Sequence, residues 1–327
     1  MIRIAIDAMG GDFAPKEIIK GAVAAAREFS ISVILVGDKV KVEAELKHYK
    51  NPTNISVVHA SEVIGMDESP TGSVRTKKDS SINVAMNLLK DGKAEAVVSA
   101  GNTGALMASA LFKLGRISGI ERPAIATIFP TQKGEVLLLD MGANVDCKPQ
   151  HLYQFAQMGS VYAERVMHVK DPKVGLLNIG EEAEKGNELT LAAYALIKTA
   201  PINFIGNVES KDILSGDADV IVCDGFVGNM ILKFGESVSL MLFSLLKEEM
   251  DKHPVSKLGL FFMLPVLRNL MKRIDYDELG GALLLGVAGV CVKAHGRAKA
   301  KAIKNAIGVA AEAASEKIVE RMSHLGK

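Results

Sequence analysis

The sequence is poor in cysteine and aromatic residues and carries almost no net charge. It has three cysteines, no tryptophan and 5% aromatic residues among 327. Cys147, Cys223 and Cys291 are far apart and never spaced as C-x-x-C, which argues against a disulfide framework or a structural zinc site and indicates a reducing compartment. The 39 basic and 38 acidic side chains leave a formal charge of +1. Because no global field attracts nucleic acid, nucleic-acid binding is not expected.

Targeting signals and long apolar runs are also missing. Residues Met1–Asp7 lead straight into a short apolar strand and lack the form of a signal peptide. No stretch supplies the roughly 18 or more consecutive apolar residues that a membrane-spanning helix requires. These absences predict a cytoplasmic protein that is not integral to a membrane.

Several common catalytic signatures are absent. No two glycines stand two positions apart, so the G-x-G-x-x-G dinucleotide fingerprint cannot occur. The P-loop, the G-x-S-x-G nucleophile elbow and the H-E-x-x-H zinc motif are missing, as is the H-x-x-x-x-D pair of many glycerolipid acyltransferases. We therefore predict a reaction without a cofactor and without a metal ion.

Short β-branched runs alternate with longer helical patterns along the whole chain. Apolar runs such as Ile31–Val36 and Val136–Leu139 suit strands that helices cover on both faces. No repeat or Pro/Ser-rich linker divides the sequence. We predict one continuous α/β domain over residues 1–327, ending in a helix over Arg297–Met322.

A helical insertion is predicted at about 229–275, beginning with a long helix over Asn229–Met250 that Asn229 caps. Beyond it, Leu258–Leu267 is apolar, is interrupted by Pro265 and is too short to span a bilayer. On the residues alone, a buried or dimer-interface helix is favoured for this segment. The alternative is an apolar tip that dips into a membrane surface while flanking basic residues meet anionic headgroups. That alternative assigns membrane contact to Leu260, Phe261, Phe262 and Leu264.

Gly, Asn and Asp cluster in five segments that follow predicted strands. They are Asp7–Asp12, Ser99–Gly104, Asp140–Asn144, Asn178–Glu182 and Asp224–Asn229. In open α/β sheets, ligands bind beyond the carboxyl ends of the strands. Glycine there lets backbone N–H groups approach a ligand, and the N-terminus of the next helix favours an anion. One such loop is only a turn and a helix cap, but five predict a shared anion-binding crevice.

Cations and proton-transfer groups come from two further segments. Glu184–Leu189 contains Lys185, and Lys293–Gly296 contains Lys293 and His295. Each alone is more often structural or solvated than catalytic. In a thioester reaction, such groups can bind a phosphate nucleophile, stabilise the developing oxyanion or protonate the departing thiol.

Taken in order, the motifs resemble the phosphate acyltransferases of bacterial phospholipid synthesis. The resemblance extends from residue 4 to 296, and although each motif is weak alone, the ordered set is specific. The matching segments are Asp7–Asp12 with Ala14-Pro15, Ser99–Leu106, Gly115-Arg116, Arg122-Pro123, Asp140–Asp146 with Lys148-Pro149, Gly175–Asn178, Lys185–Leu189, Asn203–Glu209, Asp224–Asn229, Gly280–Ala282 and Lys293–Gly296.

The resemblance implies an enzyme that converts acyl-(acyl-carrier protein) and inorganic phosphate into acyl phosphate and free carrier protein. A membrane glycerol-3-phosphate acyltransferase uses that product, so functional coupling to it is expected. The implied fold is a three-layer α/β/α sandwich similar to isocitrate and isopropylmalate dehydrogenases and to phosphotransacetylases. The resemblance also implies a homodimer that associates peripherally with the membrane through a helical hairpin, which favours the membrane-tip interpretation of 258–267.

Site residues are predicted on this basis for a direct displacement without a covalent acyl-enzyme. Lys185, Asn229 and His295 are expected to be catalytic: Lys185 holds phosphate, Asn229 stabilises the oxyanion, and His295 or Lys293 binds phosphate or protonates the thiolate. The other predicted substrate-binding residues are Gly10, Gly11, Gly101, Asn102, Gly104, Asn144, Asn187 and Gly225, with Asp7, Asp140 and Asp224 orienting cations and loops.

Three rival functions remain open from the sequence. A phosphotransacetylase-like enzyme would use acyl-CoA in the same chemistry. A decarboxylating dehydrogenase would share the fold but needs a metal-binding carboxylate set and a nicotinamide site. A non-catalytic scaffold would gather lipid-synthesis enzymes on the membrane and release no thiol.

Overall fold

The computed structural model of the chain describes residues 1–50, 52, 54–252 and 280–325. The residues predicted to contact a membrane, Leu260, Phe261, Phe262 and Leu264, lie outside the described residues. Of the predicted insertion at 229–275, the described part is its first helix.

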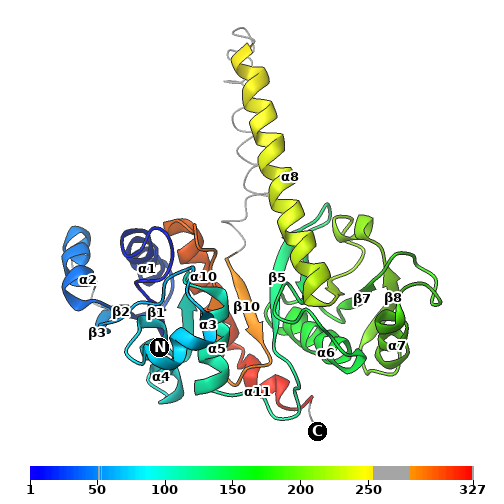
Figure 1. Cartoon of the computed structure of the whole chain (residues 1–327), viewed down its shortest axis with the longest axis horizontal. Coiled ribbons are helices and arrows are strands. Elements are labelled where there is room, and N and C mark those ends of the chain that lie inside the picture. Colours follow the sequence, from blue (N-terminus) through cyan, green and yellow to red (C-terminus); the bar gives the residue numbers. More distant parts are fainter. Residues whose placement is uncertain (51, 53, 253–279, 326–327) are drawn as a thin grey trace.

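One 11-stranded sheet runs through the molecule in the order β3-β2-β1-β4-β11-β10-β5-β6-β9-β7-β8. The strands are β1 Ile2–Asp7, β2 Ile31–Gly37, β3 Ile55–His59, β4 Ala96–Ser99, β5 Ala124–Pro130, β6 Glu135–Leu139, β7 Lys173–Leu177, β8 Asn203–Val208, β9 Val220–Val222, β10 Ala282–Leu285 and β11 Val290–Lys293. Strands β3, β2, β1, β4 and β11 are parallel to one another, as are β6, β9, β7 and β8. The antiparallel strands β10 and β5 join these two parallel groups at the centre of the molecule (Figure 1).

Helices cover both faces of this sheet. They are α1 Lys16–Glu28, α2 Lys39–Leu46, α3 Pro70–Thr76, α4 Ser81–Lys90, α5 Thr103–Lys113, α6 Pro149–Arg165, α7 Glu188–Ile197, α8 Gly225–Lys252, α10 Ala300–Ser315 and α11 Ile318–Met322. The alternation of side chains along β1 shows the two faces, since Ile4 and Ile6 enter one buried cluster and Ala5 enters the other. Ile18 of α1 and Ile303 of α10 belong to the first cluster, whereas α4 and α5 contribute to the second. The predicted mixed α/β architecture is confirmed.

Two predicted helices differ from those in the structure. The segment Arg297–Met322 forms two helices, α10 and α11, because Lys317 adopts a left-handed conformation with φ 51° between them. The long helix α8 begins at Gly225, before the predicted start at Asn229. Asp224 caps it, since the Val227 N–H donates to Asp224 Oδ1 at 2.9 Å. The prediction of Asn229 as the cap was therefore wrong.

Helix α8 projects well beyond the sheet and the other helices (Figure 1). Its part Gly225–Leu246 has a mean hydropathy of 1.3 and is long and apolar enough to cross a membrane by length and composition. Core helices of soluble proteins can share both properties, but they are mostly buried, whereas none of the described side chains in the most apolar 18-residue window of α8 is buried. Phe234 and Leu240, for example, are 72% and 70% exposed. The sequence analysis, which counted only unbroken apolar runs, did not single out this helix.

Candidate functional site

Three neighbouring parallel strands bring Asp7, Ser99 and Lys293 into one row. Each residue is the last of its strand, and the register pairs Asp7 of β1 with Ser99 of β4, and Ser99 with Lys293 of β11. The loops after these strands carry most of the residues predicted to bind phosphate. The row and its three loops are called the first loop group below.

Hydrogen bonds order the buried end of this row. Ser99 Oγ donates to Asp7 Oδ2 at 2.7 Å, and the Gly101 N–H donates to Ser99 Oγ at 3.0 Å. The Met9 N–H donates to Asp7 Oδ1 at 3.2 Å. Burial raises the pKa of Asp7, and the hydrogen bonds to its carboxylate oppose that rise. These bonds join Asp7 to the loops that follow β1 and β4, and Ser99 is a residue of this network that the sequence analysis did not select as a site residue.

The three loops of the first group are in direct contact. A Cβ added to Gly10 would lie 2.4 Å from Asp7 Oδ2 and 2.8 Å from the Gly101 nitrogen, so only glycine fits there. The Asp12 N–H donates to the Gly296 carbonyl at 2.8 Å. The predicted residues Gly10, Gly101 and the 293–296 segment are therefore brought together.

Lys293 carries the most perturbed cation of this group. Its Nζ donates to the carbonyls of Ala294 and, at 3.4 Å, Ala100. The pKa of Lys293 is lowered to about 8, chiefly by burial and also by the charge of Lys233, while the charges of Asp7 and Asp12 oppose the decrease. An ammonium of this pKa can bind an anion or give up a proton near neutral pH.

Asn102 and Gly104 stabilise the loop after β4 and its contact with the segment 66–70. Asn102 Oδ1 caps α5 by accepting from the Ala105 N–H at 3.0 Å, and its Nδ2 donates to the Met66 carbonyl at 2.8 Å. A Cβ on Gly104 would lie 2.6 Å from Pro70 Cγ. The amide of Asn102 is occupied by these bonds, so a role in substrate binding would fall to its backbone.

A second loop group follows β6 and β9, which are also adjacent and parallel. Asp140 is fully buried and accepts from the N–H groups of Ile125 at 2.9 Å, Ala143 at 3.0 Å and Asn144 at 2.7 Å. Asn144 Nδ2 donates to Asp140 Oδ2 at 2.8 Å, and the Asn144 carbonyl accepts from the Gly225 N–H at 2.8 Å. Burial raises the pKa of Asp140, which these bonds oppose. Asp140 and Asn144 thus fix the start of α8.

Helix α8 links the second group to the first. Asn229, Lys233 and Glu236 stand at i, i+4 and i+7, on one face of the helix. Lys233 Nζ lies 3.2 Å from Glu236 Oε2, and Glu236 Oε1 lies 3.9 Å from His295 Nε2. Gly225 and Glu236 are separated by about 16 Å along the axis. Lys233 and Glu236 were missed, although their helical spacing from Asn229 is readable in the sequence.

The predicted residues Lys185 and Asn187 lie in the loop between β7 and α7. Asn187 caps α7, since its Oδ1 accepts from the Thr190 N–H at 2.9 Å. The exposed Lys185 has its carbonyl bound by Asn178 Nδ2 at 2.9 Å and its N–H bound to the Glu182 carbonyl at 3.1 Å. Among the residues that the structure describes, these contacts of Lys185 stay within its own loop. The structure therefore does not bring Lys185 into contact with the other two loop groups.

A cluster of three carboxylates lies near this loop. Glu181, Glu209 and Asp212 present ligand atoms within 4.8 Å of one another. Lys211 already pairs with two of them, with Nζ 3.1 Å from Glu181 Oε1 and also in contact with Glu209. Lys211 and these carboxylates thus form an ion-pair network.

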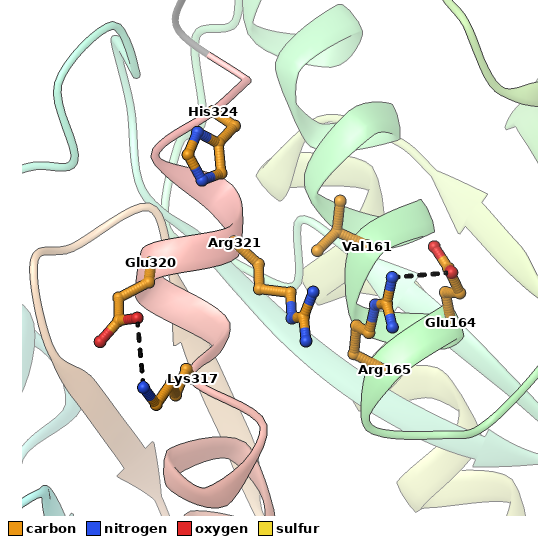
Figure 2. Close-up of a pocket in the computed structure, with 7 residues that line it drawn as sticks. All are labelled: Val161, Glu164, Arg165, Lys317, Glu320, Arg321 and His324. Atoms are coloured by element: carbon orange, nitrogen blue, oxygen red, sulfur yellow. Dashed lines mark ion pairs between the residues drawn. The ribbon is translucent and has the colours of Figure 1, made fainter.

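A cavity of about 370 Å³ lies between the end of α6 and α11 (Figure 2). Its lining residues are Val161, Glu164, Arg165, Lys317, Glu320, Arg321 and His324. Local ion pairs join Glu164 to Arg165 at 3.2 Å and Lys317 to Glu320 at 3.8 Å. It contains none of the predicted site residues and lies at the end of the molecule away from the projecting part of α8 (Figure 1).

Comparison with known proteins gives consistent relatives over almost the whole chain. The pattern that defines the family "Fatty acid synthesis protein" matches residues 2–321. A phosphate acyltransferase from Moorella thermoacetica is 56% identical over 324 residues, covering 99% of this chain and 96% of the relative. A phosphate acyltransferase from Heliobacterium modesticaldum is 55% identical over 320 residues, covering 97% and 96%.

Solved structures show a similar fold. A phosphotransacetylase from Streptococcus pyogenes superposes with a TM-score of 0.68 at 15% identity, covering 96% of this chain and 94% of that one. A protein described as a 4-hydroxythreonine-4-phosphate dehydrogenase, from Salmonella typhimurium, superposes with a TM-score of 0.54 at 13% identity, covering 95% and 99%. At these identities the likeness shows the fold alone, and it confirms the predicted similarity of fold to phosphotransacetylases.

Proposed function

Since this chain belongs to the phosphate acyltransferases of the fatty acid synthesis protein family, we propose that the acyl group it transfers to phosphate comes from the thioester of acyl-carrier protein. The product is acyl phosphate, which serves phospholipid synthesis. The row of Asp7, Ser99 and Lys293 carries the proposal, together with His295 in the loop after Lys293 and Glu236 near His295. Lys293, whose pKa is lowered, and the closely packed Gly10 and Gly101 lie at the ends of parallel strands, which is where α/β folds bind anions.

Phosphate is seated by the backbone near Gly10 and Gly101 and by the charge of Lys293. One phosphate oxygen attacks the carbonyl carbon of the thioester, and the carbonyl oxygen becomes an oxyanion. Asn229 and neighbouring backbone N–H groups stabilise that oxyanion. The C–S bond then breaks, the sulfur leaves with the electron pair, and the thiolate takes a proton from Lys293 or His295. A thiolate is a fair leaving group, so most of the rate comes from positioning.

Lys185 is retained in the proposal as a phosphate-binding cation. It is exposed, and the hydrogen bonds described above hold its backbone. Its loop is at the carboxyl end of β7, which neighbours β9 in the same parallel group as β6. In this proposal, Lys185 reaches the bound phosphate from the side of the second loop group.

The donor is tested by an assay of free thiol released in the presence of phosphate, with acyl-carrier protein and acyl-CoA carrying the same acyl chain. We expect a kcat/KM at least tenfold higher for the carrier-protein donor. A preference for acyl-CoA would make the chain a phosphotransacetylase-like enzyme. Phosphate-independent release would instead indicate a thioesterase.

The finer predictions of architecture and location are retained as proposals. They are a single catalytic domain built as a three-layer sandwich, a helical hairpin that begins with α8, a homodimer, peripheral membrane attachment in the cytoplasm, and coupling to a membrane glycerol-3-phosphate acyltransferase. The exposed apolar side chains of α8, including Phe234 and Leu240, support a partner surface or a lipid contact. Sedimentation equilibrium tests the dimer, and co-sedimentation with anionic vesicles tests the attachment.

A further inference from the structure

Asn207 of β8 has a buried side-chain amide whose Nδ2 forms a hydrogen bond, whereas its Oδ1 forms none with the residues that the structure describes. The residue is 6% exposed, and its Oδ1 is the buried side-chain atom that lacks a hydrogen-bond partner among the residues the structure describes. A buried acceptor without a partner is unfavourable, so an apolar side chain of the same size would be tolerated at least as well on grounds of stability. The presence of asparagine at this position is therefore explained by the hydrogen bond that its Nδ2 donates.

The donor of Asn207 reaches the loop that carries Lys185. Asn207 Nδ2 donates to the Glu182 carbonyl at 2.8 Å. The same carbonyl accepts from the backbone N–H of Lys185 at 3.1 Å. One oxygen thus joins the buried amide directly to the backbone of the predicted phosphate-binding lysine.

The turn that contains this carbonyl lies on the surface. Glu181, Glu182, Ala183, Glu184 and Lys185 are all exposed. The carbonyl of Lys185 is bound by Asn178 Nδ2 at 2.9 Å, which fastens the far end of the turn. Asn207 is the buried anchor at its near end. Because a long, exposed lysine loses its preferred direction when its backbone moves, the anchor matters for where the ammonium is presented.

We propose that Asn207 is a positioning residue for acyl transfer, holding the turn 182–185 through the Glu182 carbonyl so that Lys185 is directed at phosphate. This inference rests on the phosphate-binding role proposed above for Lys185. It adds a residue whose side chain touches neither substrate nor the reacting atoms.

The test compares Asn207→Leu with Asn203→Leu. Asn203 lies at the other end of the same strand, and its Nδ2 likewise bonds a loop, to Asp171 O at 3.2 Å and Oδ2 at 3.0 Å. We expect Asn207→Leu to lower kcat/KM for phosphate about tenfold, chiefly through KM, with little change in melting temperature. Asn203→Leu should leave both kinetic constants within about twofold of wild type. If Asn207→Leu does not fold, Asn207→Ala removes the same donor and is expected to show the same loss.

Two further readouts separate positioning from mere structure. Hydrogen exchange in the peptide containing 182–187 should be faster in Asn207→Leu than in wild type, since the Lys185 N–H shares the released carbonyl. The double variant with Lys185→Ala should be no slower than Lys185→Ala alone. Normal kinetics in both Asn207 variants, or losses that add to those of Lys185→Ala, would overturn the inference. A near-normal Lys185→Ala would instead remove the role proposed for the lysine.

Discussion

Nε2 of His295 lies 3.9 Å from Oε1 of Glu236. His295 follows β11 in one parallel half of the sheet, whereas Glu236 belongs to the helix that begins after β9 in the other half. The approach therefore brings a residue of the first loop group near the helix that starts in the second loop group.

Glu236→Gln is expected to lower kcat about tenfold, because the neutral amide no longer holds Lys233 and His295 by charge, and catalytic groups lose rate when their orientation is relaxed. The measurement is the initial rate of thiol release at saturating phosphate. Glu248→Gln is the matched control, since Glu248 lies on the same helix and pairs only locally with Lys252 at 2.8 Å. Equal rates for the two variants would argue against a role of Glu236 in orienting Lys233 and His295.

The activity should depend on the protonation of Lys293. Because its pKa is lowered to about 8 and its ammonium is the form that binds phosphate or donates a proton, activity should fall as pH rises through that value. Arginine stays charged across this range, so Lys293→Arg should lose the decline even if its rate is lower. The check is a pH–rate profile of kcat/KM for phosphate, corrected for spontaneous thioester hydrolysis. An identical alkaline decline in wild type and variant would assign it to another group.

The same lysine should make stability rise with pH. Its folded pKa of about 8 lies below the ordinary value of 10.5, so between these values the unfolded state binds more protons and the free energy of unfolding increases with pH. Lys293→Met removes this contribution. Urea unfolding at about pH 7.5 and about pH 10 should show wild type gaining stability relative to the variant. A constant difference at the two pH values would contradict the burial of the ammonium.

Gly10→Ala should damage both stability and activity. The added methyl carbon would lie 2.4 Å from Asp7 Oδ2, so the loops must shift, at a cost of about 1–3 kcal/mol. Gly235→Ala is the control, because the nearest atom to its added carbon, Phe129 Cε1, is 3.9 Å away. Thermal unfolding and thiol release measured on both variants decide the matter. A Gly10→Ala enzyme with wild-type turnover would show that the close contact is dispensable.

Replacing Lys185 or His295, which are both predicted to be catalytic, should lower the turnover. Lys185→Ala and His295→Ala are each expected to reduce turnover about 10²-fold or more, since phosphate binding and proton transfer depend on them. Circular dichroism confirms that the variants are folded before rates are compared. A near-normal rate for either variant would refute that residue's role.

Local chemistry explains which site predictions the sequence could support. A glycine or carboxylate directly after a β-branched run indicates a strand end, and the parallel order of such strands brings their loops to one edge. Asp7, Gly10 and Gly101 were found in this way, and they do meet. Lys185 was selected differently, as a cation in a segment between a strand and a helix and through the family resemblance. Its loop follows β7 in the other parallel group, and the order of strands in a sheet cannot be read from the residues of one strand.

By itself, the sequence determined the α/β class, the glycine-bearing loops that follow several strands and the membership of the family, because periodicity, glycine placement and ordered motifs are local properties. The tertiary structure decided which strand ends are neighbours. It placed Lys293 on the strand next to Ser99, in surroundings that lower its pKa, and it set Glu236 near His295. Both depend on strand order and on burial, which arise only when segments far apart in the chain pack together.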